Sequence, residues 1–415
     1  TAVRAAPADG AAGPPTTFRP CLRRPGAPCI GLGMFQRGRR ILDIKPPPYR
    51  ADHVGSLLRS SAVKEARHRH YDEGAMSRED LAAVEDEAIR DVIKLQQDVG
   101  LPVATDGEIR RSFWHYDFMQ DLTGFKFVQR DVATGHNFKG ANTKPIFPTI
   151  TGPVDFPADH PMLEHFKFVA ANTSVMPKIS IPGPSCCHFR VARDDIGHKP
   201  YADDVELLFA DLAKAYKKAV AAFYAAGCRY LQMDDIFFAY LCDPKIRAEK
   251  QAQGLDPDWL IEQYAKMMHD AIEGRPDDMV IGMHMCRGNF KSTWIAEGAY
   301  DPAADAVFNK TGVDIYFMEY DTERAGGLEP LRLLPKGNKR VMPGFITTKT
   351  GEPESLDSLR RKFDEAGKFA DLEQMGIAPQ CGFSSTEEGN AITVDDQKRK
   401  LELVVKTAEA IWGSV

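Results

Sequence analysis

The segment DVELLFADLAKAYKKAVAAFYAAGCRYLQMDD, residues 204–235, joins a long amphipathic stretch to a short apolar one. In its first part, apolar residues recur with the spacing of one helix face, and Gly227 is a residue type that often follows a helix end. The second part, Arg229–Met233, predicts a buried strand that ends directly before Asp234 and Asp235. A helix that leads into a strand in this way is the repeating unit of α/β proteins.

The same alternation continues on both sides of this unit. Further short apolar segments predict strands over Arg50–Val54, Pro102–Thr105, Lys178–Ile181, Met279–Met283, Asp314–Met318, Arg340–Phe345 and Gly376–Pro379. Helices are predicted over 77–100 and 204–227, and over the approximate ranges 258–273, 355–374 and 394–412. Together these strand–helix units favour an α/β fold of the (β/α)8 TIM-barrel type, with a doubly wound parallel sheet as the alternative.

Residues 107–177 interrupt the alternation. This stretch is too long for a plain barrel loop, and it contains aromatic residues and pieces typical of a hairpin, such as Phe125–Val132. We therefore expect an elaborated loop after the second strand.

Composition excludes several classes of protein. The chain has 415 residues, 43% of them hydrophobic, and a formal net charge of −6, which argues against a disordered protein and against nucleic acid as the main partner. No apolar run is long enough for a membrane helix, so no membrane partner is expected. The eight cysteines of so long a chain indicate free or metal-bound thiols and a reducing, cytoplasmic compartment.

The first 48 residues differ from the rest. Residues 1–50 contain nine Lys or Arg against only Asp9 and Asp43, and they are rich in proline without apolar periodicity. We expect residues 1–48 to be a disordered basic tail, either an organelle transit peptide or a plain upstream extension. Residues 49–415 would then form a single catalytic barrel.

Polar residues follow almost every predicted strand. The residues at these strand ends include Asp52, His53, Ser56, Glu108, Cys186, Cys187, Asp234, Asp235, His284, Cys286, Arg287, Asn289, Glu319, Asp321, Thr347, Thr348, Lys349, Gln380 and Cys381. Because the carboxyl ends of barrel strands form the active-site face, this concentration predicts an enzyme.

Four of these residues have the character of metal ligands. His284 and Cys286 lie two apart on an extended segment, so both side chains point the same way, while Glu319 and Cys381 end two other strands. One nitrogen, two sulfur and one oxygen donor suit tetrahedral Zn²⁺, which would favour a nucleophilic thiolate. The alternative is that both cysteines are buried apolar thiols and that the glutamate is an exposed acid.

Several motifs together resemble a known family. ADHVGSLLR (51–59), DGEIRRSFW (106–114), YLQMDD (230–235), HMCRGN (284–289), MEYD (318–321) and PQCGF (379–383) are similar to the catalytic barrel of cobalamin-independent methionine synthase. They are closest in pattern to its short, single-barrel relatives. The resemblance implies a TIM barrel of the uroporphyrinogen decarboxylase/methionine synthase-like type over about residues 49–412.

The resemblance also implies roles by position. His284, Cys286, Glu319 and Cys381 match the zinc ligands of the family. Ser56 matches a site for the homocysteine carboxylate, and Glu108 and Asp234 match the acids that hold its amino group. The implied activity is a zinc-dependent S-methyltransferase, in which homocysteine accepts a methyl group as a zinc thiolate and becomes methionine.

Other site residues are less clearly matched. The histidine proton donor of the family is replaced by Thr347-Thr348-Lys349, so Lys349 becomes the candidate catalytic acid alongside Asp234. His53 and Arg287 are further candidates for substrate binding. Each acid that would hold the amino group also has a structural alternative, since Glu108 could pair with a neighbouring arginine and Asp234 could cap a helix.

Other functions remain open at this stage. A related epoxide:coenzyme M transferase would use the same metal but would need cations for a sulfonate. A structural zinc would make the barrel a binding module, and a related decarboxylase barrel would hold no zinc. The methyl donor could be methyl-folate, a methylated corrinoid protein, S-methylmethionine or an aryl methyl ether, and homo-oligomers are possible. The long enzymes of the family have a second, N-terminal barrel that helps to bind folate. A single barrel has no counterpart for it, which makes folate a less secure choice of methyl donor.

Overall fold

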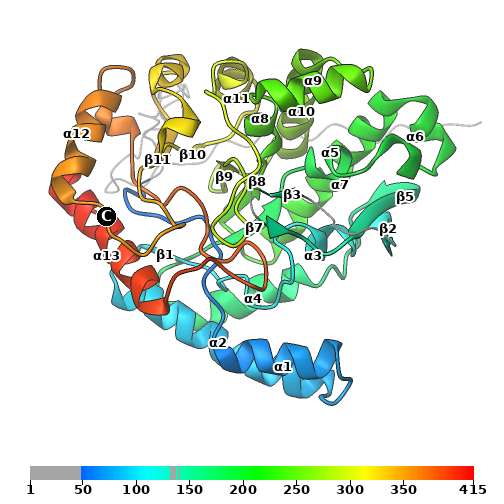
Figure 1. The fold of residues 1–415 in the computed structure, drawn as a ribbon, viewed down its shortest axis with the longest axis horizontal. Coiled ribbons are helices and arrows are strands. Elements are labelled where there is room, and N and C mark those ends of the chain that lie inside the picture. The colour runs from blue at the N-terminus through cyan, green and yellow to red at the C-terminus, as the bar shows by residue number, and fades with distance from the viewer. Residues whose placement is uncertain (1–47, 131–136, 139–140) are drawn as a thin grey trace, which may run out of the picture. The chain divides into compact units, whose positions relative to one another are not determined.

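The fold is known from a computed structural model that describes residues 48–130, 137–138 and 141–415. The predicted disordered tail therefore lies outside the described residues, except for Pro48. The central element is a five-stranded sheet in the order β11-β10-β9-β8-β7, in which every neighbouring pair is parallel (Figure 1). A parallel sheet of this kind confirms the predicted α/β class.

The strands agree closely with the predicted apolar segments. The central strands are β7 (Ile179–Pro182), β8 (Tyr230–Asp234), β9 (Val280–Met285), β10 (Ile315–Glu319) and β11 (Arg340–Gly344). The remaining strands are β1 (Val103–Ala104), β2 (Thr123–Gln129), β3 (Asn137–Phe138), β4 (Ala141–Asn142), β5 (Ile146–Asp155) and β6 (Met176–Pro177). All residues of β7, β8, β10 and β11 are buried, which explains why their sequences lack a polar alternation.

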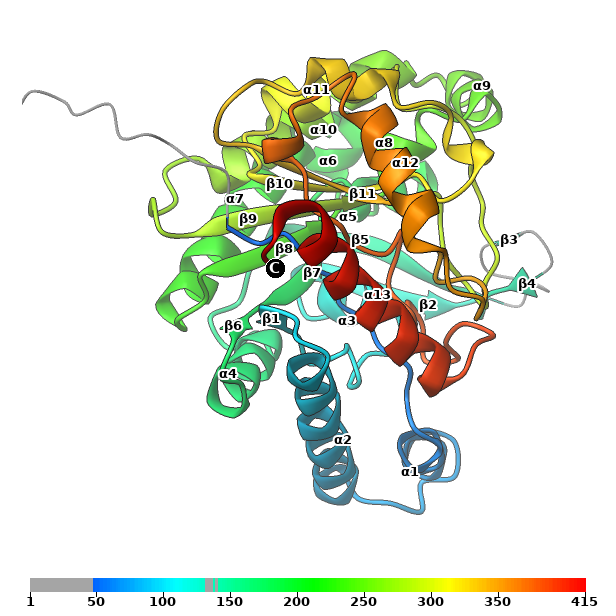
Figure 2. The ribbon, with the colours of Figure 1, turned by 90° about the vertical axis from the view of Figure 1, so that its left-hand side faces the viewer.

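Helices lie on the outside of these strands (Figures 1 and 2). The α-helices are α1 (Ser61–Tyr71), α2 (Arg78–Asp98), α3 (Tyr116–Met119), α4 (Met162–Asn172), α5 (Cys186–Phe189), α6 (Lys199–Asp203), α7 (Val205–Ala225), α8 (Phe237–Tyr240), α9 (Pro244–Ala252), α10 (Pro257–Ile272), α11 (Ala304–Lys310), α12 (Leu356–Ala366) and α13 (Val394–Trp412). Short 3₁₀ turns are η1 (Arg193–Asp195), η2 (Glu323–Ala325), η3 (Glu329–Leu333) and η4 (Leu372–Gln374).

Local capping explains where the long helices begin. The Ser77 side chain accepts a hydrogen bond from the Asp80 amide at the start of α2, and the Asp204 side chain caps α7 in the same way. Thr393 and Asp396 form a reciprocal capping box at the start of α13. The predicted helix over about 355–374 is shorter in the structure, because α12 stops at Ala366 and only the turn η4 follows.

The first and last predicted strands are joined by isolated parallel bridges rather than by continuous ladders. Ala51 forms a parallel bridge with Ile377. The Asp52 amide donates to the Ile377 carbonyl at 3.0 Å, and the Ile377 amide donates to the Arg50 carbonyl at 2.7 Å. Glycine suits position 376, since a Cβ there would lie 2.9 Å from the backbone carbonyl oxygen of Arg50. The bridge of Ile346 with Pro379 connects this segment to the sheet beyond β11.

The second predicted strand pairs on one side only within the described residues. β1 is parallel to β6, which leads directly into β7. Two hydrogen bonds connect β1 to the first segment, and both lie past the end of β1. The Leu57 amide donates to the Gly107 carbonyl, and the Thr105 hydroxyl donates to the Gly55 carbonyl. No backbone ladder joins Arg50–Val54 to β1 in the described part of the chain.

The long stretch after the second strand forms a separate hairpin. β2 pairs antiparallel with β5, and a smaller pair, β3 with β4, lies between them in the sequence. This confirms the expected hairpin character of the insertion, although the last residues of the predicted piece 125–132 fall outside the described residues. The strands of this hairpin lie near the end of the central sheet at which its parallel strands have their carboxyl termini (Figure 1).

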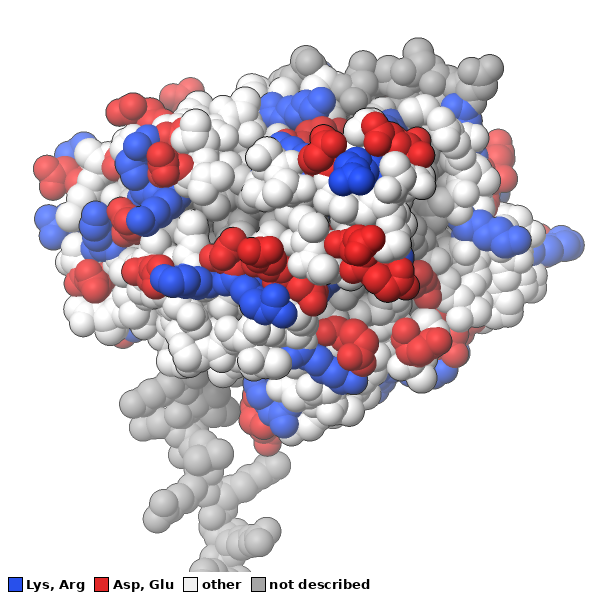
Figure 3. Space-filling view, turned by 90° about the horizontal axis from the view of Figure 1, so that it is seen from below, with Lys and Arg blue, Asp and Glu red and all other residues white. Residues whose placement is uncertain are grey.

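The surface bears mixed charge. On the face drawn in Figure 3, acidic and basic side chains are interspersed, and no broad positive field appears on that face. Among the described helices, none combines the length and the apolar character that crossing a bilayer requires.

A buried ion pair ties the first segment to the central sheet. The Lys178 ammonium, which is fully buried, donates to Asp52 Oδ1 at 2.8 Å and to the His53 carbonyl at 2.6 Å. The Tyr230 hydroxyl donates to the other oxygen of Asp52 at 2.7 Å. Each charged group is therefore compensated, which a buried pair requires if it is not to destabilise the fold.

Lys178→Met should destabilise the protein by about 3–5 kcal/mol, because it leaves the Asp52 carboxylate buried without its cation. Denaturant unfolding measures this loss. The matched control is Lys310→Met, which breaks a half-exposed pair with Glu262 and should cost less than about 1 kcal/mol. Equal losses in both variants would contradict the importance of the buried pair.

Candidate metal and substrate site

A cavity lies at the carboxyl ends of the central strands. Its wall consists of Val54, Ser56, Glu108, Phe113, Trp114, His115, Phe138, Thr143, Arg190, Asp234, Ile236, Tyr240, His284, Cys286, Gly288, Asn289, Cys381, Gly382, Ser385 and Thr386. Six of the predicted site residues thus meet in one place although they come from five separate parts of the sequence. In α/β folds with parallel strands, ligands bind at the carboxyl ends of the strands, which is where this cavity lies.

Three potential metal ligands gather in this cavity. His284, Cys286 and Cys381 each offer a ligand atom, and these atoms lie within 4.8 Å of one another. His284 on β9 and Cys286, the residue directly after β9, both line the cavity, as expected for residues two apart on an extended segment. Neither ring nitrogen of His284 has a hydrogen-bond partner at normal geometry among the described residues, although the side chain is buried. A buried histidine that makes no hydrogen bond of normal geometry, beside two thiols, fits a metal site.

The two sulfurs interact directly. Cys286 Sγ and Cys381 Sγ are 3.6 Å apart and share a hydrogen bond. That bond lowers the pKa of Cys381 well below the usual range of a thiol, against the effect of burial, and His284 and Lys349 lower the pKa further. The cluster therefore already favours one thiolate, which is the form that binds a metal.

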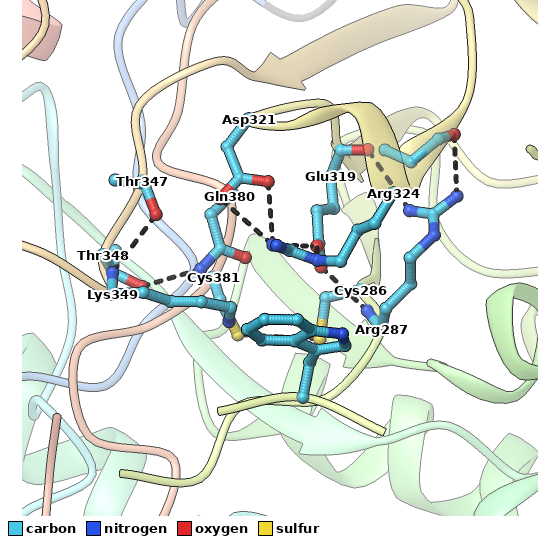
Figure 4. Close-up of polar contacts among 12 residues, drawn as sticks. Cys286, Arg287, Glu319, Asp321, Arg324, Thr347, Thr348, Lys349, Gln380 and Cys381 are labelled. Carbon is cyan, nitrogen blue, oxygen red and sulfur yellow. Dashed lines mark hydrogen bonds and ion pairs between the residues drawn. The ribbon is translucent and has the colours of Figure 1, made fainter. Parts of the chain in front are cut away.

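The predicted fourth ligand, Glu319, has other partners in the structure. Its carboxylate is fully buried at the end of β10, where Oε1 accepts from Arg324 Nε at 2.7 Å and Oε2 accepts from the Arg287 amide at 2.8 Å (Figure 4). Burial alone would raise the pKa of Glu319, but Lys349, Arg324 and Arg287 outweigh it and lower the pKa. Glu319 is accordingly an anion, but it is not part of the three-residue cluster.

A close backbone approach fixes Ser56 beside Cys381. The Ser56 hydroxyl accepts from the Ser384 amide at 3.2 Å, and a Cβ on Gly382 would lie only 2.0 Å from that hydroxyl oxygen. Position 382 therefore has to be glycine if Ser56 is to reach the last strand. Thr348 supports the same turn, since its hydroxyl donates to the Gly382 carbonyl at 3.1 Å and accepts from Gln380 at 2.9 Å.

Two buried acids face the cavity on the side of β8. Asp234 ends β8 and accepts a 2.7 Å hydrogen bond from Gln232, and Glu108 accepts a 2.8 Å hydrogen bond from Ser180. Burial raises the pKa of both carboxyls; that of Glu108 reaches about 7, with nearby Asp234 adding to the rise and Arg111 opposing it. Burial thus disfavours the ionised form of both acids, and a cationic group of a ligand would stabilise that form in each.

The backbone of Glu108 is strained in a way that suits a binding site. Glu108 has φ of 57°, in the left-handed region that non-glycine residues rarely occupy. Two hydrogen bonds hold this conformation. The Glu108 amide donates to the Asp106 carboxylate at 2.9 Å, and the Arg59 guanidinium donates to the Glu108 carbonyl at 2.6 Å. The Arg111 guanidinium lies 3.7 Å from the second carboxylate oxygen, so the salt bridge considered from the sequence is present but long.

Besides Glu319, three predicted site residues are absent from the cavity wall that the described residues form. His53 is buried next to the Asp52–Lys178 pair, where burial and the Lys178 charge lower its pKa to about 4. The guanidinium of Arg287 donates to the Gly298 and Ala325 carbonyls and lies over a tyrosine ring. Lys349 donates to the Gly288 carbonyl at 3.3 Å and to Asn289 Oδ1 at 3.5 Å.

Several cavity residues were not singled out from the sequence. Arg190 and Tyr240 lie after α5 and at the end of α8, two short helices that follow β7 and β8 directly. Trp114 and His115 also belong to the cavity wall. The only sequence signal for Arg190 and Tyr240 was their position a few residues beyond a strand end.

Known proteins share this fold and sequence. Residues 50–409 match the family of the cobalamin-independent synthase catalytic domain. The chain is 42% identical over 377 residues to the uncharacterised protein YxjG of Bacillus subtilis (strain 168), covering 90% of this chain and 97% of that protein. It is also 22% identical over 331 residues to the methionine synthase of Sulfolobus acidocaldarius, covering 79% of this chain and 84% of that protein.

Solved structures agree. A Listeria monocytogenes protein assigned as a vitamin-B12-independent methionine synthase superposes with a TM-score of 0.70 at 36% identity, covering 89% of this chain and all of that one. A B12-independent methionine synthase from Shewanella sp. W3-18-1, solved with selenomethionine, shares the fold with a TM-score of 0.63 at 21% identity, covering 88% and 97%. The resemblance inferred from the motifs is thereby confirmed: the chain belongs to the family of cobalamin-independent methionine synthase catalytic domains and is an enzyme of the methyltransferase class.

Proposed function

We propose that this enzyme is a zinc-dependent S-methyltransferase that methylates the thiol of homocysteine to give methionine. The observation that carries the proposal is the presence, in one cavity, of the His284–Cys286–Cys381 cluster and of the acids Glu108 and Asp234. The first group suits a metal that binds sulfur, and the second suits an ammonium.

The cluster fits zinc by its donor chemistry. His284 would bind through a ring nitrogen and Cys286 and Cys381 through thiolates, which leaves a fourth position for a substrate thiol. When bound there, Zn²⁺ would favour the deprotonated, nucleophilic form of that thiol. In the free enzyme, Glu319 would take that fourth position, and the substrate thiol would replace its carboxylate, which also accepts from Arg324 and from the Arg287 amide. Lys349 would add positive charge beside the anionic sulfurs.

The substrate end of the cavity favours an amino-acid thiol over a sulfonate thiol. A sulfonate needs cations, and among the lysines and arginines of the described residues the cavity wall holds Arg190 alone. Arg287 is committed to backbone carbonyls, and Lys349 donates to Gly288 and Asn289. The acid pair instead offers an ammonium two carboxylates, with Ser56 near the other end for the carboxylate. Binding in this orientation would hold the sulfur for in-line attack on a methyl carbon.

We further propose that the strands close into a (β/α)8 barrel over residues 49–415. The parallel bridges of Ala51 with Ile377 and of Ile346 with Pro379 support this closure on one side. On the other side, the Asp52–Lys178 pair and the Leu57–Gly107 backbone bond hold the first segment against the second and third.

The metal site is tested by cysteine substitution. Purified wild-type protein is expected to hold about one zinc ion per chain, and Cys381→Ala should lose most of it together with thiol alkylation, because a ligand and its charge are removed. Metal analysis measures the content. Cys228→Ala, which removes a buried thiol bonded to the Tyr230 carbonyl, is the control and should keep the metal. A Cys381→Ala protein with full zinc and full alkylation activity would refute the assignment.

The amino-group site is tested by the pH dependence of binding. L-Methionine carries the same amino and carboxyl groups as homocysteine but no thiol proton, so its titration isolates this end of the cavity. Because the pKa of Glu108 is about 7 and an ammonium favours the ionised form, affinity should be full above pH 7 and fall as the pH drops, approaching tenfold per unit.

In Glu108→Gln, calorimetric titration should give weaker binding at pH 8 and a flatter pH dependence between pH 6 and 8. Asp121→Asn, a partly buried acid outside the cavity wall, should keep the wild-type profile. An unchanged profile in Glu108→Gln would mean that another group holds the ligand. Competition of homocysteine against coenzyme M for the wild-type enzyme separates the two classes of thiol directly.

A further inference from the structure

The Tyr240 hydroxyl is a buried polar group that the proposed function has not used. Tyr240 ends α8, is 1% exposed and lines the cavity that also contains His284, Cys286 and Cys381. Among the described residues its hydroxyl makes no hydrogen bond of normal geometry, and Arg190 is a looser hydrogen-bond neighbour that acts on its pKa. A buried hydroxyl so weakly bonded in a ligand cavity is expected to meet a partner on the ligand.

The hydroxyl lies close to the thiol cluster. A Cβ on Gly288 would be 2.9 Å from the hydroxyl oxygen, and Gly288 is only two residues beyond Cys286. Gly288 has φ of 92°, so its backbone turns at the point where the tyrosine approaches. A substrate sulfur bound at the cluster would therefore have the Tyr240 hydroxyl among its near neighbours.

A cation accompanies this hydroxyl. The Arg190 guanidinium carbon lies 5.8 Å from the centre of the Tyr240 ring and 5.2 Å from that of Phe237. Among the lysines and arginines of the described ranges, Arg190 is the one in the cavity wall. Burial raises the pKa of Tyr240 and Arg190 lowers it, so the phenol remains a proton donor while the cation favours the anion formed once the proton has left.

The reaction needs such a donor for some methyl sources. The family histidine is replaced here by Thr347-Thr348-Lys349. Lys349 is not one of the residues of the cavity wall, and its ammonium donates to the Gly288 carbonyl and to Asn289 Oδ1. When a methyl group leaves nitrogen or oxygen, the departing atom takes the bonding electron pair and requires a proton. A sulfonium donor releases a neutral thioether and requires none.

We propose that Tyr240, positioned by Arg190, donates the proton to the departing nitrogen or oxygen of the methyl donor. The substrate sulfur forms the new S–C bond with its lone pair, the bond from carbon to nitrogen or oxygen breaks toward the departing atom, and the Tyr240 proton moves to that atom. The tyrosinate regains a proton from water, which balances the proton lost by the substrate thiol. This inference rests on the proposed function and assigns the donor to the N-methyl or O-methyl class.

Tyr240→Phe separates the donor classes. With homocysteine as acceptor, transfer from 5-methyltetrahydrofolate should fall by about 10²–10⁴-fold, the range of general acid catalysis, while transfer from S-methylmethionine should change less than threefold. Tyr320→Phe is the matched control, because Tyr320 also has a buried hydroxyl without a partner in the described residues but lies outside the cavity wall. It should keep both rates.

Arg190 is tested as a positioning residue by rescue. Arg190→Met should slow transfer from 5-methyltetrahydrofolate alone, and Arg190→Lys should recover much of that rate because it restores the cation. Methionine affinity should stay unchanged in every variant. Equal losses with both donors in Tyr240→Phe would overturn the inference, and so would a wild-type enzyme that uses only the sulfonium donor, since homocysteine methylation would then stand without a proton donor. Failure of the wild-type enzyme to methylate homocysteine from any donor refutes the proposed function and this inference with it.

Discussion

The parallel register of β8 against β9 is the constraint on which the site depends. It sets Asp234 opposite His284, and the Asp235 amide donates to the His284 carbonyl at 2.8 Å. Because all five central strands run in the same direction, their carboxyl ends lie at one edge and their polar ends share one cavity. A shift of one residue would turn His284 and Cys286 away from that cavity together, since side chains alternate along a strand. The placement of His284 and Cys286 at the cavity is in this sense a consequence of strand pairing.

The buried acids at this edge fall into two kinds. Glu319 is compensated by Arg324, Lys349 and Arg287, which lower its pKa despite burial. Glu108 and Asp234 are only partly compensated, and burial raises the pKa of both. An amino acid that places its ammonium at the second pair and its sulfur at the cysteines would relieve the charge imbalance of the free cavity. The charge distribution thus gives the proposed substrate both its class and its orientation.

The sequence predicted the elements and much of the site. Six of the eight expected strands form ladders within a residue or two of the predicted bounds, because strands buried on both faces leave short, strongly apolar segments. The cluster of His284, Cys286 and Cys381 was also predicted from strand ends. The position of His53 was not predicted, because His53 is buried beside the Asp52–Lys178 pair and outside the described cavity wall. Similarly, Arg324 comes from a loop whose path depends on tertiary packing, so its ion pair with Glu319 had no sequence signal. Tyr240 and Arg190 were missed for the same reason: short helices after β7 and β8 bring them into the cavity.

The most direct test of the account is X-ray absorption at the zinc edge of the purified enzyme, recorded with and without homocysteine. The account predicts two sulfur ligands from Cys286 and Cys381 in the free enzyme and a third sulfur when homocysteine is added, with loss of an oxygen ligand. A coordination shell that is the same in both samples would contradict it, because the metal would then be structural and the substrate thiol would bind elsewhere.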